Sequence, residues 1–204
     1  LLHNKMLEWG FEPNHHEACL YTKVQNGVPI HVLCHVDDLA IASTPSNIQW
    51  FKDTLRTTFM IDDQGLVKRY LGVDITRDEQ GYTWSQSRLI AELVHAAGHT
   101  VTKNYHKQIC PIRKKKLQRH ALTQDQRTKY KKPYRNILGV VGYLVTCTRP
   151  DCAYAYKTLA QFNDCYTQEH WEALMELVAY LHNTADSHVL RLTKSGGTLL
   201  NAYC

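Results

Sequence analysis

An Asn-Gly pair at residues 26–27 separates two apolar runs, Ala18–Val24 and Val28–Val36. Asn-Gly between apolar runs is typical of a two-residue β-hairpin turn, because both residues tolerate a positive φ. The second run ends at Asp37-Asp38, and a third apolar run follows over Leu39–Ser43. The pattern predicts a three-stranded antiparallel meander that carries an acidic pair at its second turn.

Asp37 and Asp38 put two negative charges side by side. Adjacent like charges cost free energy unless a cation or hydrogen-bond donors compensate for them. Carboxylates at the tip of a hairpin are typical of enzymes that transfer nucleotidyl groups, where they hold divalent metal ions that activate a hydroxyl group. An ordinary polar turn is the alternative, because Asp is common in turns. The pair alone leaves both interpretations open.

The remaining patterns predict a sheet first, then helices, and a hairpin at the end. Helical periodicity is present over residues 1–10 and from Ser46 onward, where Gln49 completes the pattern of a capping box. The runs Tyr70–Ile75 and Tyr82–Gln86 flank a turn and predict a second hairpin. Further helices are predicted over Ser87–Ala97, Tyr134–Cys147, Asp151–Asn163 and Thr167–Asn183. A final hairpin is predicted from the strands Val189–Thr193 and Thr198–Tyr203. This order indicates an α+β fold.

Half of the basic side chains, 12 of 24, lie between residues 101 and 135, where Asp125 is the only acidic residue. The block includes the run Lys114, Lys115 and Lys116. Such a block is either a solvated linker or a surface that lies against phosphates. Charge alone does not separate the two interpretations.

The seven cysteines are scattered without a CxxC pair, which favours reduced thiols over a disulfide framework. His15, His16 and Cys19 are close in sequence, but no second ligand pair follows at the spacing of a zinc finger, so zinc is disfavoured. No apolar run reaches the roughly 18 residues that span a bilayer, and no signal-peptide pattern opens the chain. Because Leu1 is not a start Met, we expect the sequence to be a piece of a longer protein.

Several blocks of the chain follow one another in the order of one protein family. They are Gly10-Phe11, Cys19-Leu20-Tyr21, His35-Val36-Asp37-Asp38-Leu39, Tyr70-Leu71-Gly72-Val73, Trp84-Ser85-Gln86, Tyr134-Arg135, Gly142-Tyr143-Leu144, Thr148-Arg149-Pro150-Asp151 and His170-Trp171. With these blocks the chain resembles the reverse transcriptase of copia-type LTR retrotransposons, part of a Pseudoviridae-like pol polyprotein. The resemblance spans nearly the whole sequence.

The resemblance implies roles for particular residues. Asp37 and Asp38 would be catalytic, metal-binding carboxylates, with Mg²⁺ or Mn²⁺ as the cofactor of a complete palm. The residues that would contact primer or template are His35, Tyr70, Leu71, Gly72, Lys114, Lys115 and Lys116. The implied partners are an RNA template, a DNA primer, dNTP and the rest of the pol polyprotein. The implied location is a cytoplasmic virus-like particle with possible access to the nucleus.

The resemblance also implies a division of the chain. Residues 1–86 would be the end of the palm, with an antiparallel sheet, a packing helix and the acidic and primer-gripping hairpins. Residues 87–132 would be a thumb-like helix and basic linker, and residues 133–204 a helical connection that ends in a β-hairpin before an absent ribonuclease H domain. Another catalytic Asp of the family precedes the point where this sequence starts, so we expect these 204 residues to be inactive alone.

Two positions depart from the family pattern. His35 stands where the family has Tyr, and Lys157 stands where it prefers an apolar residue. These departures are compatible with a decayed genomic copy. The alternatives to a polymerase fragment are therefore a pseudogene product without activity and a non-catalytic module that binds nucleic acid through the basic block.

Overall fold

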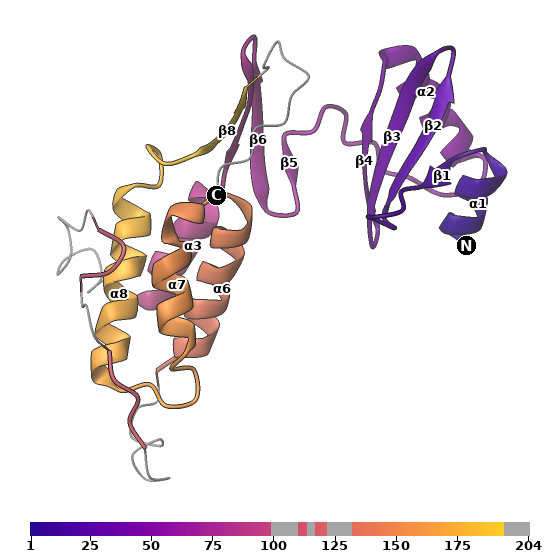
Figure 1. The fold of residues 1–204 in the computed structure, drawn as a ribbon. Helices are drawn as coiled ribbons and strands as arrows, with labels where there is room; N and C mark the ends of the chain where they lie inside the picture. Colours follow the sequence, from indigo (N-terminus) through magenta and orange to yellow (C-terminus); the bar gives the residue numbers. More distant parts are fainter. Residues whose placement is uncertain (99–109, 114–116, 122–131, 194–204) are drawn as a thin grey trace. The chain divides into compact units, whose positions relative to one another are not determined.

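A computed structural model describes residues 1–98, 110–113, 117–121 and 132–193 of the chain. The chain divides into two compact units, Leu1–Val67 and Lys68–Cys204. Each unit contains one antiparallel four-stranded sheet together with helices (Figure 1). The predicted α+β class is therefore confirmed.

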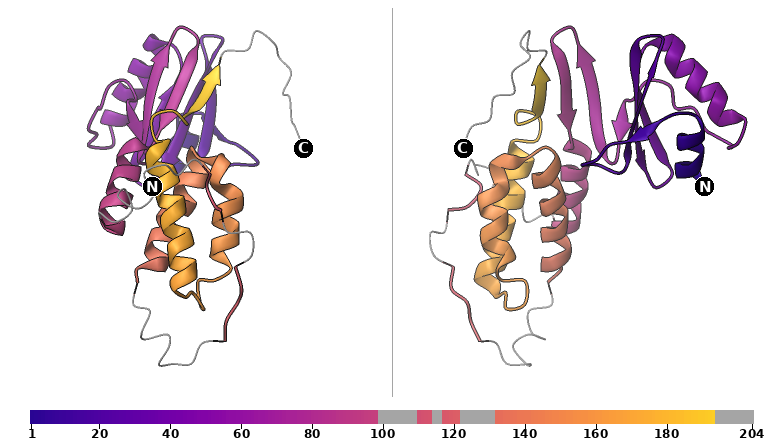
Figure 2. Two further views of the ribbon diagram at one scale, coloured as in Figure 1. Left: turned by 90° about the vertical axis from the view of Figure 1, so that its left-hand side faces the viewer. Right: turned by 45° about the vertical axis from the view of Figure 1, so that its right-hand side comes forward.

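The first unit is an antiparallel sheet with two helices packed on one face (Figure 2). Its elements are α1 (Leu2–Glu8), β1 (Glu12–Pro13), β2 (Leu20–Gln25), β3 (Val28–His35), β4 (Asp38–Ala42) and α2 (Pro45–Arg56). The strand order is β1-β2-β3-β4, so the predicted meander is confirmed and gains one short edge strand. That strand was not predicted, because two residues, one of them a proline, are too few to show an alternation of apolar and polar side chains.

The core of the first unit lies between this sheet and its helices. Met6 of α1, Ile30 and Val32 of β3 and Phe51 of α2 are fully buried there. Asn26 and Gly27 have φ of 53° and 75°, which confirms the predicted hairpin turn.

The start of α2 differs from the predicted capping box. The N-cap is Thr44, Pro45 opens the helix, and no side chain caps the first turn. The Gln49 side chain donates to Asp53 one turn further on, at 2.9 Å, instead of reaching back to the N-cap. The prediction of a capping box at Ser46 and Gln49 is therefore wrong: Pro at the first helical position already supplies the helical φ and lacks one of the unpaired N–H groups.

The second unit contains a sheet whose fourth strand comes from far along the chain. Its strands are β5 (Arg69–Tyr70), β6 (Val73–Asp78), β7 (Gly81–Ser85) and β8 (Leu190–Thr193), in this order. The prediction of one continuous strand over Tyr70–Ile75 is wrong, because a two-residue turn at Leu71-Gly72 folds β5 back on β6. The run β8 confirms the first strand of the predicted last hairpin, while Thr198–Tyr203 lies outside the described residues.

The helices of the second unit form a bundle around one core (Figures 1 and 2). They are α3 (Ser87–Ala97), α6 (Tyr134–Cys147), the 3₁₀ helix η1 (Pro150–Cys152), α7 (Ala153–Ala160) and α8 (Gln168–Asn183). The predicted Asp151–Asn163 helix is shorter than expected, because its start is the 3₁₀ turn and α7 ends at Ala160. Ile90, Leu138, Leu144 and Leu177 represent the buried core between these helices.

The structure also bears on membrane-spanning helices and on the state of the cysteines. No helix in the described part of the chain is long and apolar enough to cross a membrane. Six described cysteines are free thiols, as expected: Cys19, Cys34, Cys110, Cys147, Cys152 and Cys165. The domain boundaries after residues 86 and 132 stay predictions.

Candidate functional site

The acidic hairpin places its turn one residue earlier than predicted. His35 of β3 pairs with Asp38 of β4, so Val36 and Asp37 form the two-residue turn and Asp38 already belongs to the strand. Val36 has a φ of 52° and its side chain is 84% exposed. The left-handed conformation costs a non-glycine residue roughly 1–2 kcal/mol. Local strain of this kind persists only where the surrounding structure maintains it, and strained residues are concentrated at functional sites.

The two carboxylates of this hairpin are exposed and uncompensated. Among the described residues, none forms a hydrogen bond or an ion pair with the carboxylate of Asp37 or Asp38. The exposed His35 stands directly opposite Asp38 across the strand pair. Two adjacent negative charges without a donor or cation nearby leave their oxygen atoms available to an external ligand.

A second Asp-Asp pair in the same unit shows the contrast. Asp63, which follows Asp62, accepts from Lys52 at 2.7 Å and from Arg56 at 3.4 Å. The hydrogen bond from Lys52, followed by that from the Gly65 backbone, lowers the pKa of Asp63. Within the described ranges, cations therefore compensate one acidic pair and not the other.

The acidic hairpin supplies only a small set of metal ligands. No group of three or more His, Cys, Asp or Glu side chains placed to hold a metal ion occurs in the described ranges. Mg²⁺ prefers octahedral oxygen coordination and usually keeps several waters, so two carboxylates can hold it when other oxygen ligands complete the shell. The chemistry of Asp37 and Asp38 fits this ion.

The predicted primer-binding residues Tyr70, Leu71 and Gly72 form the end of β5 and the turn into β6. Leu71 and Gly72 have φ of 47° and 74°. The hydroxyl of Tyr143, on α6, donates to the carbonyl oxygen of Leu71. Lys114, Lys115 and Lys116 lie outside the described residues, so the nucleic-acid-binding role of the basic block stays a prediction.

The Thr148–Asp151 block forms a polar network in which Thr148 and Arg149 are buried and Asp151 reaches the surface. The Arg149 side chain is 1% exposed and contacts Asp151 through two hydrogen bonds, at 3.0 and 2.9 Å. Arg149 also donates to the Thr184 hydroxyl at 2.7 Å, and Tyr180 donates to Asp151 at 2.9 Å. Burial opposes ionisation of Asp151, but the hydrogen bonds and charge of Arg149 hold its pKa below the usual value. The network joins the end of α6 to the end of α8.

In the sequence, this block is a feature of the family resemblance and has no predicted physical role. Thr148 donates to the side-chain oxygen of Gln86 at 2.8 Å, and both residues are buried. Thr184 and Tyr180 lie about thirty residues further along the chain than Asp151. An Arg two residues before an Asp could have suggested an ion pair, but nothing in the sequence pairs Arg149 with Thr184.

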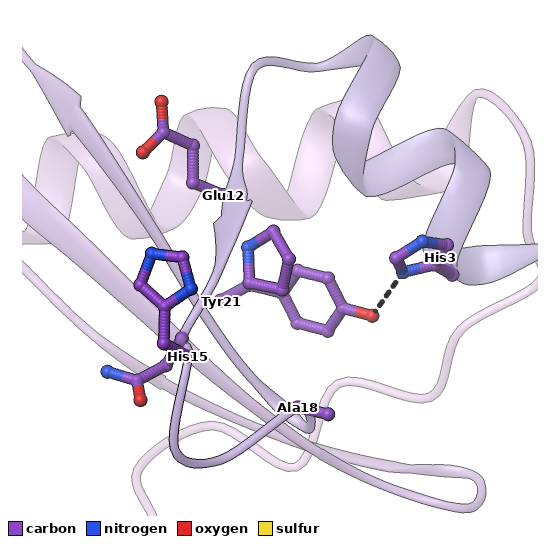
Figure 3. Close-up of a pocket in the computed structure, with 7 residues that line it drawn as sticks. His3, Glu12, His15, Ala18 and Tyr21 are labelled. Atoms are coloured by element: carbon purple, nitrogen blue, oxygen red, sulfur yellow. Dashed lines mark hydrogen bonds between the residues drawn. The ribbon is translucent and has the colours of Figure 1, made fainter.

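A separate pocket lies beside α1 and the start of β2 (Figure 3). Its lining residues are His3, Glu12, Pro13, Asn14, His15, Ala18 and Tyr21. His3 Nδ1 and the Tyr21 hydroxyl are hydrogen-bonded at 2.8 Å across one side of it. None of the predicted site residues lines this pocket.

Comparison with known proteins matches the chain to a reverse transcriptase family and to Pol polyproteins of transposons. Residues 1–114 match the family described as reverse transcriptase (RNA-dependent DNA polymerase). The retrovirus-related Pol polyprotein from transposon RE1 of Arabidopsis thaliana is 30% identical over 203 residues, which cover 99% of this chain. The corresponding polyprotein from transposon TNT 1-94 of Nicotiana tabacum is 27% identical over 186 residues, which cover 82% of this chain.

The relatives differ widely in length. The chain spans 13% of the RE1 polyprotein and also 13% of the TNT 1-94 polyprotein. The putative transposon Ty5-1 protein of Saccharomyces cerevisiae is 26% identical over the whole chain, which covers 65% of that protein. No solved structure matches the chain.

Proposed function

The chain belongs to the reverse transcriptase family of copia-type retrotransposons, and from this premise we propose that it forms part of an RNA-directed DNA polymerase. Asp37 binds a divalent metal ion in this proposal, and Asp38 adds negative charge to the same site. The observation that carries the proposal is the exposed acidic pair at the strained Val36-Asp37 turn and the start of β4, whose carboxylates have no partner among the described residues. At the other acidic pair of the first unit, Asp62-Asp63, Lys52 and Arg56 form ion pairs with Asp63.

The proposed partners are an RNA template, a DNA primer, dNTP and the rest of a pol polyprotein. In two-metal nucleotidyl transfer, the ions activate the primer hydroxyl and stabilise the charge on the leaving group. The chain's own residues hold and orient these components. Asp37 and Asp38 provide metal ligands, His35 lies beside them for the primer end, and the Leu71-Gly72 turn contacts the primer.

Metal binding at the acidic turn is tested by paramagnetic relaxation. Titration of the 204-residue chain with Mn²⁺ is expected to broaden the amide signals of residues 35–39 before other signals. Asp37→Asn is expected to raise the Mn²⁺ concentration for half broadening about tenfold or more, equivalent to ~1.4 kcal/mol of binding free energy. Asp62→Asn is the matched control, because it removes one charge from an acidic pair that already has Lys52 and Arg56. Equal effects of the two substitutions would contradict the proposal.

Activity of the 204-residue chain alone is tested by primer extension with Mg²⁺ or Mn²⁺. We expect no extension of a DNA primer on an RNA template, because two-metal transfer requires carboxylates that converge from at least two places in a chain. Within the described ranges, Asp37 and Asp38 come from a single hairpin and join no larger ligand group. Template-dependent extension that is lost in Asp37→Asn would show that the chain carries a complete metal site.

A further inference from the structure

The turn at Leu71-Gly72 has a conformation that its first residue does not favour. Both residues have a positive φ, 47° and 74°, as in the type I′ turns of two-residue hairpins. The hairpin at Asn26-Gly27 has nearly the same values, 53° and 75°, but with Asn at the first position. Asn tolerates the left-handed region, whereas for Leu it costs roughly 1–2 kcal/mol. The Leu71 turn therefore carries a conformational cost that the Asn26 turn does not, and a contact to the turn can offset it.

Tyr143 of α6 supplies that contact. Its hydroxyl donates to the carbonyl oxygen of Leu71, which fixes the peptide plane between the two turn residues. Its ring lies beside the second turn residue, since a Cβ placed on Gly72 would be 3.8 Å from Cε1 of Tyr143. At Gly27, by contrast, a Cβ would meet nothing within 4 Å. The two turns share a geometry, and of the two glycines only Gly72 has another side chain beside it.

The helix behind this contact is anchored in the core of the second unit. Val141 and Leu144 flank Tyr143 in α6 and are both 0% exposed in the core of the second unit. The Leu71 side chain is 36% exposed, so burial of Leu71 does not by itself hold the turn. Partial burial, together with the neighbouring Cys147, raises the pKa of Tyr143. The phenol hydroxyl is a donor at neutral pH even without this shift.

From these contacts we propose that Tyr143 is a positioning residue that holds the Leu71-Gly72 turn in the conformation that contacts the primer end. The primer contact itself rests on the proposed function. The positioning does not, because it concerns the hydrogen bond and ring contact within the second unit. Tyr143 touches the turn and not the reacting atoms, so it acts through Leu71 and Gly72.

The test compares Tyr143→Phe with the wild-type chain in two measurements. The three-bond HN–Hα coupling and carbonyl shift of Leu71 report the turn, and they are expected to move away from left-handed values when the hydroxyl is removed. Affinity for an RNA–DNA hybrid with a recessed DNA 3′ end, measured at low salt, is expected to fall about 5- to 10-fold, the equivalent of one hydrogen bond. Tyr154→Phe is the matched control, because Tyr154 is 75% exposed on α7 and its hydroxyl has no hydrogen bond to the turn in the described part of the chain. It is expected to change neither measurement.

A rescue variant separates positioning from general stability. Leu71→Asn in the Tyr143→Phe background is expected to restore the left-handed turn, because Asn adopts this conformation as Asn26 does. Unchanged Leu71 coupling in Tyr143→Phe would overturn the positioning role, and a loosened turn with unchanged hybrid affinity would overturn its link to the primer. A wild-type chain that binds no hybrid would overturn the proposed function, while the Leu71 coupling still reports the positioning by itself.

Discussion

Replacing Arg149 by Met is expected to lower the free energy of unfolding of the second unit by about 3–5 kcal/mol, toward the lower value. The change leaves the Asp151 carboxylate and the Thr184 hydroxyl without the guanidinium that pairs with them at 2.9 and 2.7 Å. A charge left partly buried without its partner costs much more than the pair contributes when intact. The lower value applies because the Asp151 side chain is 31% exposed and water screens part of its charge. Urea unfolding followed by far-UV circular dichroism measures the difference.

Two further variants show which feature of Arg149 matters. Arg149→Lys keeps the charge but cannot make the two parallel hydrogen bonds to Asp151, so an intermediate loss of stability is expected. The double variant Arg149→Met with Asp151→Leu is expected to lose less than Arg149→Met alone, because no unpaired charge remains. A loss below about 0.5 kcal/mol in Arg149→Met would mean that the ion pair does not stabilise this unit.

Local signals in the sequence predicted the elements that are held together by local contacts. The Asn26-Gly27 turn was identified because both its residues favour a positive φ, and the structure has this turn. The helices over Ser87–Ala97 and Tyr134–Cys147 have the predicted bounds, because their apolar periodicity is uninterrupted and Gly98 ends the first of them. The family resemblance located the acidic hairpin, although the turn itself starts one residue earlier.

Features that depend on distant contacts were not predictable in the same way. Leu71-Gly72 does not resemble a turn in sequence, because Leu avoids the left-handed region and is maintained there through Tyr143, 72 residues away. The partner of β8 is β7, more than a hundred residues earlier, and no local pattern identifies that pair. Whether Asp37 and Asp38 hold a metal ion stays a prediction, because their chemistry depends on ligands beyond the hairpin.

The pairing of β7 with β8 gives the second large expected effect, at Gly81. Gly81 has a φ of 155° and lies opposite Thr193, and a Cβ there would be 2.0 Å from the carbonyl oxygen of Leu192. The obstructing atoms belong to the backbone of β8 and cannot rotate away, so Gly81→Ala is expected to detach this end of β8 and destabilise the sheet by about 2–4 kcal/mol. Amide hydrogen exchange measures this detachment. Amides of β7 and β8 are expected to lose protection, while amides of α3 and α8 keep most of their protection.

Gly98→Ala is the matched control for the backbone conformation alone. Gly98 also has a positive φ, 93°, but a Cβ there would meet nothing within 4 Å. Its substitution is therefore expected to cost only the strain of this backbone conformation, about 1–3 kcal/mol, without loss of protection in β7 and β8. If Gly81→Ala costs no more than Gly98→Ala and leaves both strands protected, β8 does not lie against Gly81. In that case the close approach of β7 and β8 would not explain the glycine at position 81. The turn at Glu79-Gln80 would be the reason for it instead.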